Sequence, residues 1–128
     1  MIKIIKHNTI LIKEKTNKKI NNLKFADTFF SRFKGLMFKK KLDYVLVLKP
    51  AHMKSKRASA IHTCFMRIAI DIVFLDENKE VFEIATLKPW KFHSPKKGAS
   101  YILEMKKGSV EKYKIAIGDK LDFVCELR

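Results

Sequence analysis

The stretch IHTCFMRIAIDIVFLD, residues 61–76, is apolar over most of its length but carries polar and charged side chains inside it. With the two-residue period of a strand, one face takes Ile68, Ile70, Ile72 and Phe74, and the other takes Ala69, Asp71, Val73 and Leu75. Asp71 therefore has apolar neighbours on its own face, two residues away on either side. An ionised carboxylate placed there loses several kcal/mol of hydration unless another group compensates it.

Two interpretations of Asp71 follow. It is either a fold-specifying buried acid, bonded to Arg32 or to loop amides, or it lines a cleft that water enters. In a continuous strand Thr63 and Arg67 share the face of Asp71 and His62 lies opposite, whereas a bend near Ala69 changes that arrangement. His62 is open to the same two interpretations, as a satisfied core histidine or as a ligand or base.

Outward from this stretch, the pattern predicts short strands separated by turns. The expected strands are 2–6, 9–14, a segment through Phe25, 44–48, 80–87, 101–105 and an alternating strand after the Gly118-Asp119 turn. The segment ADTFFSRFKGLMF changes to a helical period, with a capping Asp or Thr before it, and predicts one short helix near residues 27–35. Residues 89–99 read as a loop, and a short helical turn follows Gly108. We expect a mainly β, compact single domain over residues 1–128, a β-sandwich or flattened barrel.

The composition favours a folded protein. The chain has 128 residues, 47% of them hydrophobic, which is enough to bury a core without covalent staples. Neither a membrane-spanning apolar run nor a signal-peptide apolar region is apparent, so we expect a soluble cytoplasmic protein. The two cysteines, Cys64 and Cys125, do not resemble the framework of a secreted disulfide scaffold, although pairing between them stays open.

The formal net charge of +15 is concentrated in the first half of the chain. Residues 1–60 hold 16 Lys and Arg but 3 Asp and Glu, whereas residues 61–128 hold 12 and 10. Such a field attracts polyanions, but it also suits a solvated surface that keeps the protein in solution. The basic residues on which nucleic-acid binding would depend are Lys39, Lys40, Lys41, Lys54, Lys56 and Arg57.

Several motifs occur together and in order. They are GLMF (35–38) with Ala26 and Arg32 before it, the stretch 61–76, LKPWK (87–91), YILE (101–104) and IGDKL (117–121). Over roughly residues 20–127 the chain closely resembles the uncharacterised family known as domain of unknown function 192. The resemblance implies a compact, mainly β domain and implies no established activity.

Two departures from the family pattern concern the possible site. Ala69 stands where the family usually has Pro, which removes a rigid bend before Asp71. Lys91 replaces the Arg that usually follows Trp90. The positive charge is kept, but the planar guanidinium group, which can bind a carboxylate or phosphate through two hydrogen bonds, is lost.

The matched positions suggest a ligand cleft. Its candidate residues are Arg32, His62, Thr63, Asp71, Trp90 and Lys91. A Trp beside a cation, near a His-Thr pair and an acid, suits an amphipathic ligand such as a sugar, a nucleotide or a small anion. The expected partner is therefore a small polar or anionic ligand, with no metal and no cofactor.

Three classes of function remain open. The first is ligand binding in this cleft, and the second is association with nucleic acid through the basic half. The third is a hydrolase-type enzyme, in which His62 and Cys64 would form the nucleophile–base pair. The sequence contains no Cys-x-x-Cys, no His-x-x-x-His and no Gly-rich phosphate loop. Asp119 has a structural interpretation, because an Asp in a Gly-Asp turn can bond the backbone of that turn. The ligand, the oligomeric state and any catalysed reaction are not determined by the sequence.

Overall fold

The computed structural model of this chain describes residues 10–12, 19–20, 23–26, 42, 45–50 and 59–122. The strands are β1 (Ile10–Ile12), β2 (Lys19–Ile20), β3 (Leu23–Ala26), β4 (Val45–Leu48), β5 (Ile61–His62), β6 (Ile70–Leu75), β7 (Val81–Leu87), β8 (Phe92–His93), β9 (Tyr101–Lys106) and β10 (Leu121–Asp122). The one helix in these described ranges is α2 (Ser109–Lys112). The prediction of a mainly β fold is therefore confirmed.

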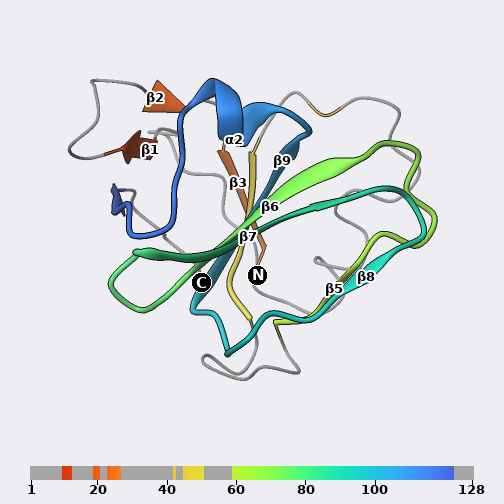
Figure 1. The fold of residues 1–128 in the computed structure, drawn as a ribbon, viewed down its shortest axis with the longest axis horizontal. Helices are drawn as coiled ribbons and strands as arrows, with labels where there is room; N and C mark the ends of the chain where they lie inside the picture. Colours follow the sequence, from red (N-terminus) through yellow and green to blue (C-terminus); the bar gives the residue numbers. More distant parts are fainter. Residues whose placement is uncertain are drawn as a thin grey trace.

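The strands form one main sheet and two smaller ones (Figure 1). The main sheet has the order β3-β4-β9-β6-β7, in which β3 and β4 are parallel and the other neighbours are antiparallel. A second sheet has the order β10-β1-β2, and β5 pairs with β8 in a short ribbon. All three sheets are open within the described residues, so these residues form no closed barrel. The helix predicted near residues 27–35 lies outside the described residues.

Strand β6 is buried on both faces because it is central in the main sheet and both of its faces are apolar. Ile70, Ile72 and Phe74 belong to one hydrophobic cluster, while Val73 and Leu75 belong to another. The two-face arrangement predicted from the alternation is confirmed. A strand that is covered on both faces typically has a nearly continuous apolar sequence, and β6 has this pattern.

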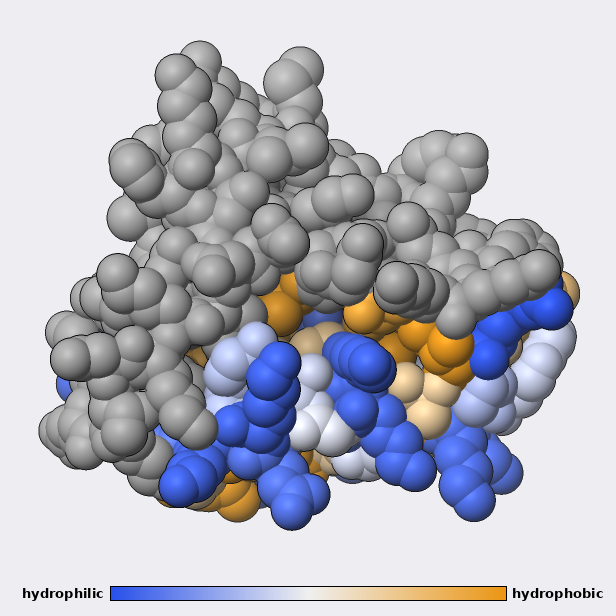
Figure 2. All heavy atoms as spheres, turned by 90° about the horizontal axis from the view of Figure 1, so that it is seen from above, coloured by the Kyte–Doolittle hydropathy of each residue, from blue (hydrophilic) through white to orange (hydrophobic). Residues whose placement is uncertain are grey.

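Different segments cover the two faces of the main sheet. One cluster includes Ile115 and Leu121, with Val110 of α2 packed against it. The other includes Ile61 and Met66. In the space-filling view, hydrophilic side chains project along the lower rim and hydrophobic residues lie above them (Figure 2).

The stretch IHTCFMRIAIDIVFLD, residues 61–76, is not one continuous strand. Strand β5 ends at His62 and β6 begins at Ile70. Between them the Met66 amide donates to the Thr63 carbonyl at 3.1 Å, and Phe65 has a left-handed φ of 63°. Thr63 and Arg67 consequently do not share a strand face with Asp71. The loop predicted over residues 89–99 also contains a strand, β8, which pairs with β5.

The Gly118-Asp119 turn has the geometry expected from its sequence. Gly118 has a φ of 95°, a conformation that glycine adopts without steric cost. The Ala116 amide donates to Asp119 Oδ2 at 2.8 Å, so the Asp119 side chain bonds the backbone of the turn as predicted. In the part of the chain that the structure describes, no helix is long and apolar enough to cross a membrane.

Candidate functional site

Thr63 joins the end of β5 to the segment before β8. Its backbone N–H donates to the Lys91 carbonyl at 2.8 Å, and its carbonyl accepts from the Trp90 amide at 2.9 Å. Its hydroxyl donates to the Lys88 carbonyl at 2.6 Å and accepts from the Lys91 amide at 2.8 Å. The residue is fully buried, with 0% of its surface exposed. Thr63 therefore positions the 88–91 segment through its own backbone and side chain, and its polar atoms face protein rather than a ligand.

The two segments that Thr63 joins present an aromatic platform, defined as Phe65, Trp90 and Phe92. The exposed fractions of these side chains are 44%, 60% and 67%. The rings of Phe65 and Trp90 have centroids 4.7 Å apart and an interplanar angle of 57°. Because the rings are tilted, they do not stack face to face, and 60% of Trp90 stays exposed to solvent.

The backbone beneath this platform is strained. Phe65 has a φ of 63° and Trp90 a φ of 62°. Left-handed backbone is uncommon for residues other than glycine and a clear outlier for bulky side chains. Strain of this kind costs on the order of 1–3 kcal/mol and persists where surrounding contacts impose it. Here the hydrogen bonds of Thr63 impose it, and the result is two aromatic side chains held at the surface.

His62 and Lys91 lie next to the platform. His62 is the antiparallel partner of Phe92 in the β5–β8 ribbon, and both side chains are exposed. Directly opposite side chains in such a pair lie close together on one face. The Cys64 amide donates to His62 Nδ1 at 3.3 Å, so a neutral His62 ring carries its proton on Nε2. Lys91 is exposed between Trp90 and Phe92.

The two segments that carry the platform contain cations but no acidic residues. Residues 59–70 and 87–100 contain no Asp or Glu, and their cations are Arg67, Lys88, Lys91, Lys96 and Lys97. All five of these side chains are exposed. Aromatic rings beside exposed cations favour anionic ligands, and the acid that lies against the second segment, Glu83, is bonded to His93 and the Lys96 amide.

The structure places Asp71 in the core. The residue is 4% exposed, and both carboxylate oxygens are used by protein groups. Oδ1 accepts from the Thr86 hydroxyl at 2.8 Å, and Oδ2 accepts from the amides of Gly108 at 3.0 Å and Val110 at 3.1 Å. Of the two predicted kinds of partner for Asp71, the loop amides are therefore present. Asp71 attaches the start of α2 to the main sheet, and we do not include it among the ligand contacts.

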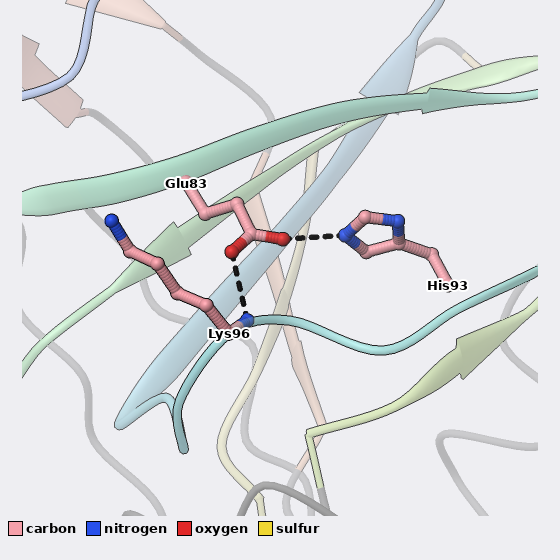
Figure 3. A network of polar contacts seen from close by, with 3 residues as sticks. All are labelled: Glu83, His93 and Lys96. Atoms are coloured by element: carbon pink, nitrogen blue, oxygen red, sulfur yellow. Dashed lines mark hydrogen bonds and ion pairs between the residues drawn. The ribbon is translucent and has the colours of Figure 1, made fainter.

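A second polar group, here called the anchor cluster, consists of Glu83, His93 and Lys96 (Figure 3). His93 Nε2 lies 2.6 Å from Glu83 Oε2, and the Lys96 amide donates to Oε1 at 2.8 Å. Partial burial acts to raise the pKa of Glu83, but the Lys96 amide bond, the His93 hydrogen bond and the charges of His93 and Lys96 together lower it. The cluster fastens the segment after β8 onto β7.

The structure brings together four of the six predicted ligand residues around one segment: His62, Thr63, Trp90 and Lys91. Arg32 lies outside the described residues, as do the basic residues Lys39, Lys40, Lys41, Lys54, Lys56 and Arg57. Cys64 is a free cysteine, and Cys125 lies outside the described residues. Across the described ranges, no group of three or more His, Cys, Asp or Glu side chains is placed to hold a metal ion.

Sequence reasoning missed Phe65, Phe92 and the Glu83–His93 contact. Phe65 occupies a variable place in the family motif, so the resemblance drew no attention to it. Phe92 and His93 lie in a segment that was predicted to be a loop, so their pairing with β5 was not predicted. The acid-free composition of residues 87–100 is the one signal in the sequence that could have indicated this surface.

The fold and the platform describe a mainly β domain with a cationic, aromatic surface. The family model of domain of unknown function 192, described as "Uncharacterized ACR", matches residues 10–123. The chain belongs to this family. A UPF0127 protein of Pyrococcus furiosus is 41% identical over 101 residues, which are 79% of this chain and 85% of that protein. A UPF0127 protein of Thermococcus sibiricus is 40% identical over 105 residues, 81% of this chain and 67% of that protein.

Two solved structures share the fold. A protein of unknown function from Novosphingobium aromaticivorans aligns with a TM-score of 0.76 and 16% identity, covering 96% of this chain and 93% of that one. A Sinorhizobium meliloti protein provisionally assigned as a transcription regulator aligns with a TM-score of 0.77 and 15% identity, covering 89% and 91%. At these identities the similarity establishes the fold alone.

Proposed function

We propose that this protein is a binding domain that takes a small polar or anionic ligand on the aromatic platform, with His62 and Lys91 as polar contacts. The observation that carries the proposal is the exposed Phe65–Trp90 pair on left-handed backbone. Strained, exposed aromatic residues contribute little to a core, so their position at the surface is better explained by contact with a ligand. Thr63 is a positioning residue in this proposal.

The experiment is a titration of the fluorescence of Trp90, the single tryptophan, with sugars, nucleotides, small anions and short oligonucleotides at two salt concentrations. We expect a saturable change with a small ligand that varies little with salt. His62→Ala and Lys91→Ala should each weaken binding by about five- to tenfold, the equivalent of about 1 kcal/mol for a lost polar contact. Lys107→Ala, which removes another exposed lysine outside this surface, is the matched control and should leave binding unchanged. If no small ligand produces a saturable response, the proposal is wrong.

Association with nucleic acid through the basic first half of the chain is the second candidate. Residues 1–60 carry an excess of 13 positive charges, and phosphate binding by several lysines weakens steeply with salt. Reversal of Lys39, Lys40 and Lys41 to Glu should abolish such binding and leave the platform unaffected. A hydrolase-type activity is third, because the described residues add no nucleophile–base pair to the His62–Cys64 proximity.

A further inference from the structure

We infer that the ligand of the aromatic platform is a mononucleotide, whose base stacks on Trp90 and whose phosphate is neutralised by Lys91 and Lys88. This inference rests on the proposed function and narrows it to one chemical class. The ligand is identified by two requirements that one molecule must meet together: a flat ring and a nearby negative charge.

The requirement for a flat ring follows from the aromatic geometry. Trp90 is 60% exposed, and Phe65 packs against it with ring centroids 4.7 Å apart at a tilt of 57°, so part of the indole surface is in contact with solvent. Every nucleobase has a π-face, and stacking on an exposed aromatic side chain is a main source of affinity for bases. The Thr63 carbonyl accepts from the Trp90 amide and from the Met66 amide next to Phe65, so the rings are preorganised and lose little freedom on binding.

The requirement for an anion follows from the charge of the same segment. Lys88 and Lys91 flank Trp90 within four residues, both are exposed, and neither forms an ion pair among the described residues. The stretch 87–100 itself contains no acid, and Glu83, the acid that lies against it, is bonded to His93 and the Lys96 amide. A neutral sugar would use the rings but not this charge, and a simple anion would use the charge but not the rings.

The test is a comparison of AMP with its two halves, adenosine and ribose 5-phosphate, by isothermal calorimetry on the full chain. We expect AMP to bind at least about tenfold more tightly than either half, because each half keeps one of the two contacts. Trp90→Ala should weaken AMP binding about tenfold, and Trp90→Phe should retain most of it. Lys91→Ala should weaken AMP but leave adenosine unchanged, whereas Lys107→Ala should change neither.

The alternative outcomes are distinct. If ribose 5-phosphate or a non-aromatic anion binds as tightly as AMP, or a neutral sugar binds best, the nucleotide inference is overturned while the proposed function stands. If a twelve-nucleotide single strand binds far more tightly than AMP with a steep salt dependence, the ligand is a nucleic acid and the inference is overturned. If nothing binds, both the inference and the proposed function fail.

Discussion

Single residues in this chain take positions that local preference opposes. Trp90 and Phe65 adopt a left-handed backbone without being glycine, and the fully buried Thr63 supplies the hydrogen bonds that hold them there. Asp71 is an acid in a hydrophobic strand because three donors, one hydroxyl and two amides, meet its carboxylate. Conflicts between local preference and global structure of this kind concentrate at functional or fold-specifying positions.

The strain at Trp90 predicts an inverted order of two substitutions. Trp90→Ala and Trp90→Gly both delete the ring, but only glycine adopts a φ of 62° without steric cost. We expect the Gly variant to be more stable than the Ala variant by about 1 kcal/mol, measured as the free energy of unfolding in urea. Ala85→Gly, within β7, is the control and should be destabilising. Equal stability of the two Trp90 variants would contradict a strained backbone.

At the scale of elements, side chains of the main sheet fix the segments that lie against it. Asp71 of β6 bonds the amides at the start of α2, and Glu83 of β7 bonds His93 of β8 and the Lys96 amide beyond it. Lys97 Nζ also lies 4.7 Å from the ring centroid of Phe82. The short elements α2, β5 and β8 thus depend on the sheet for their placement.

Replacement of Asp71 separates a structural role from a ligand contact. In Asp71→Asn the amide oxygen can still accept from Gly108 and Val110, and the amide nitrogen can donate to the Thr86 hydroxyl. We expect a loss of about 1 kcal/mol for Asn but about 3 kcal/mol for Ala, which leaves two amides without an acceptor. Urea unfolding measures both values.

Ligand affinity of the folded Asn variant should equal that of the wild type, because the carboxylate faces protein groups rather than the platform. If Asp71→Asn folds but binds the ligand more weakly than the wild type, Asp71 belongs to the binding site.

The anchor cluster predicts a pH dependence of stability. The pKa of Glu83 is lowered in the folded protein, so the ionised carboxylate stabilises the fold above the pKa of the unfolded chain. That stability is lost as pH falls through the folded-state pKa, which lies below the ordinary value of a Glu carboxyl group. We expect Glu83→Gln to cost about 1 kcal/mol at pH 7 and progressively less below about pH 4.

The measurement is the free energy of unfolding of both proteins from pH 7 to pH 3. Glu77→Gln, an exposed acid in the turn after β6, serves as the control for general charge effects. A difference between Glu83→Gln and the wild type that is constant across this range would contradict the assignment.

At the scale of the whole molecule, stability should be uneven. Strand β6 pairs with a neighbour on both sides and packs on hydrophobic clusters on both faces. The β5–β8 ribbon, in contrast, consists of two-residue strands and carries exposed rings. Local opening requires less free energy where few buried contacts are broken.

Native-state hydrogen exchange tests this difference. We expect the amides of Ile72, Val73 and Phe74 to exchange through global unfolding, and those of Ile61 and His93 to exchange through local opening at a free energy at least about 2 kcal/mol lower. A saturating ligand on the platform should slow exchange in the ribbon more than in β6. Uniform protection across both regions would contradict this view of the molecule.

Membership in the family places this domain among uncharacterised relatives, so function has to be argued from the surface itself. The expectations of a single domain over residues 1–128 and a cytoplasmic location stay predictions. The basic first half of the chain likewise keeps its predicted role as the nucleic-acid alternative.

The sequence by itself determined the features that depend on near neighbours. Alternation of apolar residues over 70–75 specified a strand with two buried faces, and the surroundings of Asp71 required that its charge be compensated. The turn chemistry of Gly118 and Asp119 was equally readable, because the bond closes within three residues. These are properties of periodicity and local geometry, which act over a few residues of chain.

Only the tertiary structure decided which distant groups meet. The amides that satisfy Asp71 are 37 and 39 residues away, and the carbonyl that accepts the Thr63 hydroxyl is 25 residues away. The contact between Phe65 and Trp90, and that between Glu83 and His93, likewise depend on how the strands pair. Local pattern carries no information on such partners, because many placements satisfy the same residue preferences until the packed sheet selects one.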